Sequence, residues 1–118
     1  MSWGDVPPDV DLGGGWRLWF VGWHPDRDLN PQYAEVPDAE RYGAVLAHPL
    51  RPGDTEPRCL ARGECQGSVT FASDTQRAIE PGRPAWEVAS WEPLTMSPSV
   101  LCHCGAHGFV QDGRWVSA

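Results

Sequence analysis

The last stretch of the chain constrains the fold more than any other. Residues 102–108 read CHCGAHG, and the chain then runs through an apolar segment to Val116. The first half is dense in thiols and imidazoles. The second half places Asp112-Gly113 between two β-prone runs, which predicts a tight hairpin because both turn positions need positive φ. The stretch therefore predicts a metal-binding turn that a β-hairpin closes.

The spacing of the cysteines and histidines favours zinc. Zinc takes four thiolate or imidazole ligands in a tetrahedron, typically as two close pairs. Two residues separate Cys104 from His107, so both side chains can fold back onto one ion, and the glycine after each allows the turn. Cys59 and Cys65 would supply the second pair from an upstream loop. We therefore predict one structural zinc ion per chain, bound by Cys59, Cys65, Cys104 and His107.

Alternatives to this ligand set stay open. Cys102 is an alternate ligand, but an extended strand would point it away from Cys104. His103 is expected to face solvent. Buried thiols or disulfides remain possible, although four cysteines without a secretory signal favour metal. A catalytic zinc is disfavoured, because Glu64 lies in an Arg- and Gly-rich loop and no metalloprotease motif is present.

Composition and patterning predict the fold class. The 13 Gly and 12 Pro in 118 residues disfavour helices. Apolar and alternating runs predict strands over residues 16–23, 42–48, 68–71 and 86–91, followed by the C-terminal hairpin. The polar stretches between them are expected to be long loops, with one helical turn over residues 38–42. We predict a mainly β fold: a small zinc-stapled antiparallel sheet or open barrel over residues 16–118, with Pro/Gly-rich loops and an extended arm over residues 1–15.

Charge and the aromatic residues bear on partners. The net charge of −7 repels phosphate, so nucleic-acid binding is disfavoured. No apolar run is long enough to predict a membrane span or a signal peptide. Aromatic side chains in an arm or on a strand with two apolar faces usually dock on something. We therefore predict that Trp3, Trp19 and Trp23 contact other protein subunits.

The segment from Trp91 to Val116 also resembles a known family. Its Leu-Thr-x-Ser-Pro-Ser run (residues 94–99), its Cys-Gly-x-His-Gly knuckle (residues 104–108) and its Asp-Gly-Arg-Trp hairpin (residues 112–115) are similar to small uncharacterised proteins of tailed phages of actinobacteria. The resemblance implies phage origin and a structural zinc, and no reaction.

Phage origin and the extended N-terminal arm with its Trp3 lead to a functional expectation. We expect a non-enzymatic structural component of the phage virion, such as a head-decoration, connector or minor tail protein, made in the host cytoplasm and bound to other phage structural proteins. The first alternative is a small soluble phage protein that modulates a host protein. The weaker alternative is a zinc-dependent hydrolase.

Overall fold

The computed structural model describes residues 5–118 and confirms a mainly β fold. Antiparallel strands form three sheets, with four, two and three strands. The largest has the order β1-β2-β3-β4, and the others are β5-β6 and β7-β8-β9. The strands are β1 (Val10–Gly13), β2 (Trp16–Trp23), β3 (Ala39–Pro49), β4 (Glu64–Thr70), β5 (Glu87–Trp91), β6 (Leu94–Ser97), β7 (Val100–Leu101), β8 (His107–Gln111) and β9 (Arg114–Ser117).

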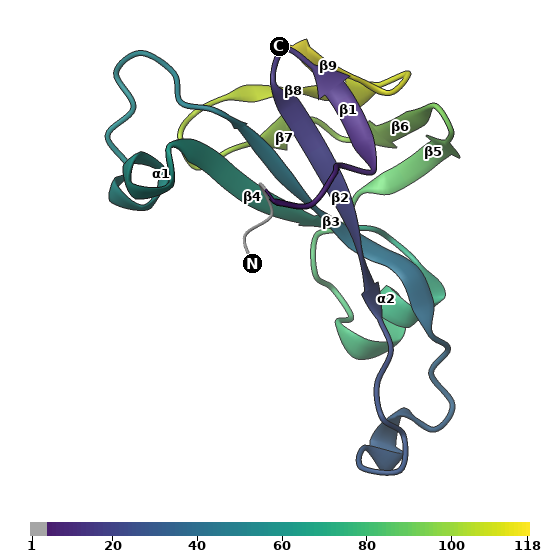
Figure 1. Ribbon diagram of the computed structural model, residues 1–118. Coiled ribbons are helices and arrows are strands. Elements are labelled where there is room, and N and C mark those ends of the chain that lie inside the picture. The colour runs from purple at the N-terminus through teal and green to yellow at the C-terminus, as the bar shows by residue number, and fades with distance from the viewer. Residues whose placement is uncertain (1–4) are drawn as a thin grey trace.

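The core lies between the four-stranded sheet and the smaller sheets, which are seen behind it in Figure 1. Strand β2 combines β-branched and aromatic residues between glycine and proline, which explains why it forms as predicted. Leu18 from β2 is fully buried, and so is Val110 from β8. Leu94 and Met96 from β6 complete the contact between the sheets.

The C-terminal hairpin is confirmed. Strands β8 and β9 pair from Gly108 opposite Ser117 to Gln111 opposite Arg114. The turn residues Asp112 and Gly113 have φ of 52° and 74°, as this type of two-residue turn requires.

Two short helices occupy segments that were expected to be loops. Helix α1 (Pro57–Arg62) starts at the Glu56 cap, whose side chain accepts from the Arg58 N–H, and it ends at Gly63 with φ of 78°. Helix α2 (Asp74–Ile79) is capped by Ser73. The loop expectation was wrong here because local caps favour a single helical turn or two, which hydrophobic periodicity does not reveal in so short a segment.

The helical turn predicted over residues 38–42 is also wrong. Ala39 starts β3 and pairs with Trp23, so these residues continue the sheet. The turn lies earlier, in the 3-10 helix η2 (Pro31–Tyr33). Pairing with a neighbouring strand overrides a weak local helical preference.

The N-terminal arm is partly a strand. Val10 and Asp11 pair with β2, and Leu12 is 1% exposed, so this segment covers the core. Trp3 lies outside the described residues. Trp19 is 2% exposed and donates its indole N–H to Val6 O, so its ring is not available to another subunit. Trp23 is half-buried with its ring edge-on to Tyr33.

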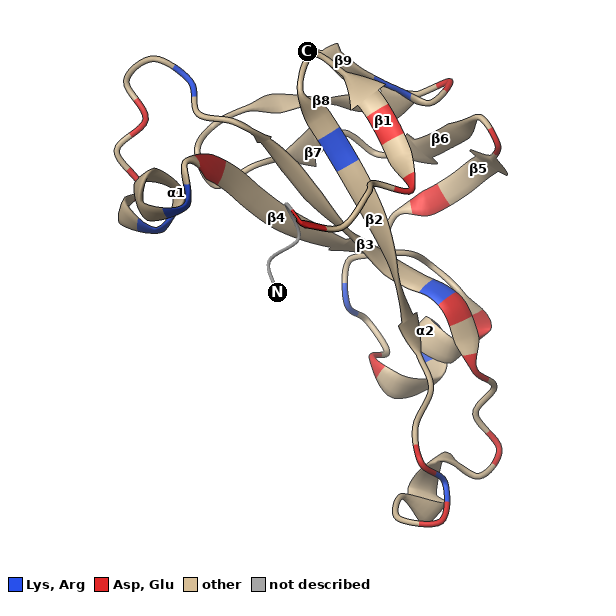
Figure 2. Cartoon of the chain, in the orientation of Figure 1, with Lys and Arg blue, Asp and Glu red and all other residues tan. Residues whose placement is uncertain are grey.

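The segment between β2 and β3 projects from the body, so the molecule measures 48 × 30 × 27 Å (Figure 1). Arg27 holds the segment together through bonds to Tyr33 O, Val36 O and the Asp38 carboxylate. Acidic residues are spread along it, as Figure 2 shows. Within residues 5–118, no helix has the length and apolar character needed to cross a membrane.

Candidate functional site: a serine and histidine beside a thiol cluster

The site is built on the hairpin of β7 and β8. Leu101 pairs with His107, and beyond the strands Cys102 N–H donates to Ala106 O at 2.8 Å. Residues 103–105 form the loop, which needs Gly105 because its φ is +94°. One strand of the hairpin therefore begins just after Ser99 and the other begins at His107. Cys102 precedes the loop between them, and Cys104 lies in it.

Ser99 and His107 contact each other directly. The Nε2 atom of His107 lies 2.8 Å from the Oγ atom of Ser99. The Trp86 indole N–H donates to Ser99 O at 3.3 Å and anchors the backbone of the serine from β5's side. A hydroxyl within hydrogen-bonding distance of an imidazole is the arrangement that lets the imidazole take the hydroxyl proton.

A cleft opens beside His107. It has a volume of about 440 Å³, and His107, Trp16 and Trp115 line it together with the segment after β3. The two indoles stack with centroids 3.6 Å apart and contribute apolar surface to the cleft. His107 is exposed, so a molecule in the cleft can reach it.

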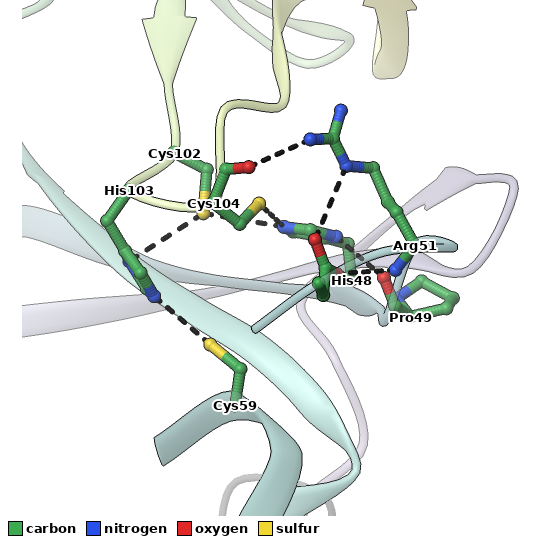
Figure 3. A network of polar contacts seen from close by, with 8 residues as sticks. His48, Pro49, Arg51, Cys59, Cys102, His103 and Cys104 are labelled. Atoms are coloured by element: carbon green, nitrogen blue, oxygen red, sulfur yellow. Dashed lines mark hydrogen bonds and ion pairs between the residues drawn. The ribbon is translucent and has the colours of Figure 1, made fainter. Parts of the chain in front are cut away.

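A cluster of thiols and imidazoles gathers at the hairpin loop, and Figure 3 shows part of it. In one group, the ligand atoms of His48, Cys65, Cys102 and Cys104 all lie within 4.8 Å of one another. A second group consists of Cys59, Cys65 and His103. All four cysteines are free, and Cys59 and Cys65 are buried. The described residues therefore contain a cluster that could hold a metal ion.

His48, at the end of β3, was not predicted. Its Nδ1 lies 2.9 Å from Pro49 O, so Nδ1 must carry the proton, because a carbonyl oxygen only accepts. Its Nε2 lies 3.4 Å from Cys102 Sγ and 3.5 Å from Cys104 Sγ. Burial lowers the pKa of His48, an effect that the hydrogen bond to Pro49 opposes. The ring stacks on Trp16 at 4.1 Å, which fixes its orientation.

The thiols are held in a poorly solvated place. Burial raises the pKa of the Cys65 thiol, and hydrogen bonds with Cys59 and Cys104 raise it further. Burial also raises the pKa of Cys102. Thiols packed this closely resist ionisation unless a cation is present, which fits a metal-binding donor set.

The structure brings some predicted ligands together and separates others. Cys65 and Cys104 meet in the first group, and Cys102, the alternate, joins them. Cys59 lies in the second group only, and His103, expected in solvent, places its Nε2 3.0 Å from Cys59 Sγ. His107 stands outside both groups because it faces Ser99. An extended strand would point Cys102 and Cys104 in opposite directions, but the chain turns between them, so both face the same group.

Motifs that are distant in sequence converge at this site. Gly113 N–H donates to Leu94 O at 2.8 Å, and Asp112 N–H donates to Thr95 Oγ1 at 2.9 Å. The Leu-Thr pair of residues 94–95 therefore holds the Asp-Gly turn. Ser99, the last serine of the run over residues 94–99, contacts His107.

Gly108 is required by packing rather than by its backbone angle. A Cβ atom there would lie 2.5 Å from Val116 O and 2.6 Å from Trp115 Cζ2. We expect Gly108→Ala to reduce the free energy of unfolding by roughly 1–3 kcal/mol and to displace Trp115. Urea titration followed by tryptophan fluorescence measures both. Gly67→Ala on β4 is the matched control, because a Cβ there meets nothing within 4 Å; equal losses in the two variants would contradict the packing argument.

The contact between His107 and Ser99 is one that serine hydrolases use. The comparison with protein families agrees: the model of the family described as bacterial ubiquitination-like system serine protease (BubE) matches residues 58–118, just over half of the chain. The chain therefore belongs to this family. No curated protein and no solved structure matches it.

The family match overturns several expectations. We expected a non-enzymatic structural component located in the phage virion. This expectation was wrong, because the matched family is described as a protease of a bacterial system. The alternative of a phage modulator of a host protein falls for the same reason. The weaker alternative, a zinc-dependent hydrolase, is closer to the family description, although that description names a serine protease and no zinc. The match includes the segment on which the phage resemblance rested, and no comparison bears on that resemblance itself.

Proposed function

We propose that this chain is a serine peptidase in which Ser99 is the nucleophile and His107 is the general base. The observation that carries the proposal is the contact of 2.8 Å between His107 Nε2 and Ser99 Oγ. A serine hydroxyl is a weak nucleophile unless a base beside it accepts its proton. The family description supplies independent support, since it names a serine protease.

The proposed reaction follows from these two side chains. Ser99 Oγ attacks the substrate carbonyl carbon while its proton passes to His107 Nε2. The imidazolium then gives that proton to the leaving amine, and an acyl-serine ester remains. Water attacks the ester with His107 again accepting a proton, which releases the acid and restores the serine.

The cleft supports a peptide substrate. His107, Trp16 and Trp115 all line it, so a peptide bound there can contact apolar indole surface beside the proposed base. Because the matched family is described as part of a bacterial ubiquitination-like system, we propose that the peptide bond belongs to a protein of such a system.

We also propose that the metal ion of the thiol cluster is zinc and that its role is structural. Thiolates with imidazole favour zinc over calcium or magnesium, which prefer oxygen ligands. When bound, the ion would cross-link the end of β3 and β4 to the hairpin loop, since the grouped side chains come from these elements. It would supply no step of the reaction at Ser99.

A serine-directed reagent tests the proposed nucleophile. We expect a fluorophosphonate to add once per chain, at Ser99, because the reagent traps a serine that a base has activated. Intact mass and peptide mapping would locate the adduct. Ser99→Ala should remove the labelling, whereas Ser117→Ala should retain it, although Ser117 lines the same cleft as His107. Labelling that survives in Ser99→Ala would refute the assignment.

A further inference from the structure

We infer that His48, Cys65, Cys102 and Cys104 bind one zinc ion, and that this ion positions the Ser99/His107 pair by fixing the loop between them. The ligand set differs from the sequence prediction at two positions: His48 takes the place of His107, and Cys102, the alternate ligand, takes the place of Cys59. The second half of the inference rests on the proposed peptidase; the first half stands without it.

The distances fit a tetrahedral ion. With zinc bonded to sulfur at about 2.3 Å and to nitrogen at about 2.0–2.1 Å, ligand sulfur and nitrogen atoms lie about 3.6 Å apart. His48 Nε2 lies 3.4 and 3.5 Å from the sulfurs of Cys102 and Cys104. The group is compact before any ion is added, and only small movements would complete the tetrahedron.

His48 also has the second contact that a metal-bound histidine typically makes. Its Nδ1–H donates to Pro49 O, so the lone pair of Nε2 faces the thiols. Stacking on Trp16 holds the ring in that direction. A side chain at 2% exposure, with its tautomer and its orientation both fixed, is ready to bind a cation.

The other histidines fit less well. The group of Cys59, Cys65 and His103 offers three ligands, and His103 is exposed. The separation of 3.0 Å between Cys59 Sγ and His103 Nε2 is that of a hydrogen bond, shorter than the edge of a zinc tetrahedron. We infer that Cys59 and His103 are not zinc ligands and that they pack around Cys65 and the loop.

The link to the Ser99/His107 pair runs along the hairpin. Ser99 directly precedes β7, and Cys102 directly follows it. Cys104 is on the loop that leads to His107. Arg51 donates to Cys104 O at 2.8 Å and steadies the loop from the segment after β3. An ion on both cysteines would hold this loop against the four-stranded sheet, and so hold β7 and β8 in the register that brings Ser99 to His107.

Metal analysis of single variants tests the ligand set. We expect about one zinc per chain in the wild type, and loss of most of it in His48→Ala and Cys104→Ser. His107→Ala is the matched control, because it removes an imidazole beside the loop that lies outside both ligand groups, and it should keep the metal. Zinc retained in His48→Ala, or lost in His107→Ala, would overturn the assignment.

Two further readouts keep the inference testable if a variant does not fold. X-ray absorption on the wild type should show three sulfur ligands and one nitrogen ligand; four sulfurs would overturn the set. For positioning, removing zinc should slow fluorophosphonate labelling of Ser99, and zinc should restore it. Unchanged labelling without metal would overturn the positioning role. A wild type that binds zinc but is never labelled would refute the peptidase and leave the metal site standing.

Discussion

Ser99→Ala is expected to abolish turnover, with a loss at least as large as that of His107→Ala. Removing a general base typically costs roughly 10²–10⁴-fold in rate. Because the two side chains act as a unit, the double variant should be about as slow as Ser99→Ala alone. Hydrolysis of p-nitrophenyl acetate measures the effect, and the wild type should release a burst of p-nitrophenol as the acyl-serine forms.

The control for this experiment must separate chemistry from folding. Neither Ser99 nor His107 belongs to the core cluster, so both variants should keep the wild-type unfolding transition. Ser117→Ala should keep the burst. A burst of full amplitude in Ser99→Ala, with zinc content and unfolding unchanged, would show that another residue is the nucleophile.

Removal of the metal is expected to have the largest effect on stability. A structural zinc ion contributes on the order of 10–16 kcal/mol in small zinc domains, and a typical domain has a total stability of only about 5–15 kcal/mol. Chelation should therefore take away most or all of the free energy of unfolding. The stacked Trp16, Trp115 and His48 rings lie beside the cluster, so near-ultraviolet circular dichroism should report the change.

A chelator already saturated with zinc serves as the control, since it has the same ionic strength and no capacity for the bound ion. Zinc added back should restore the spectrum if the thiols have stayed reduced. A metal-free protein with the same unfolding midpoint and the same tryptophan signal would mean that the cluster is a set of packed thiols without a stapling role.

Local sequence signals located the strands well. The aromatic and β-branched run of β2 and the Asp112-Gly113 turn depend on residues close together in the chain, and both appear where expected. The helices were missed because a six-residue helix depends on its caps more than on periodicity. The start of β3 was missed because Ala39 owes its conformation to Trp23 across the sheet.

The candidate site was also predicted only in part from the sequence. The close spacing of cysteines and histidines was enough to indicate a metal cluster, because ligand types and short spacing are visible in sequence. It was not enough to select the ligands. His48 is isolated from every cysteine in the sequence, and only the pairing of β3 with β4, which sets His48 opposite Cys65, brings it to the thiols.

The role of Ser99 could not be predicted from the sequence for the same reason. Ser99 stands among small and proline residues, and no sequence spacing marks its partner; its run was noticed only through a family resemblance. The fold of β7 against β8 turns His107 toward Ser99 and away from the sulfurs. The sequence by itself thus determined a mainly β chain with a turn rich in metal ligands. The tertiary structure decided which imidazole faces the thiols and which faces the serine, because the direction of a side chain on a paired strand depends on register, a property of two strands and not of one.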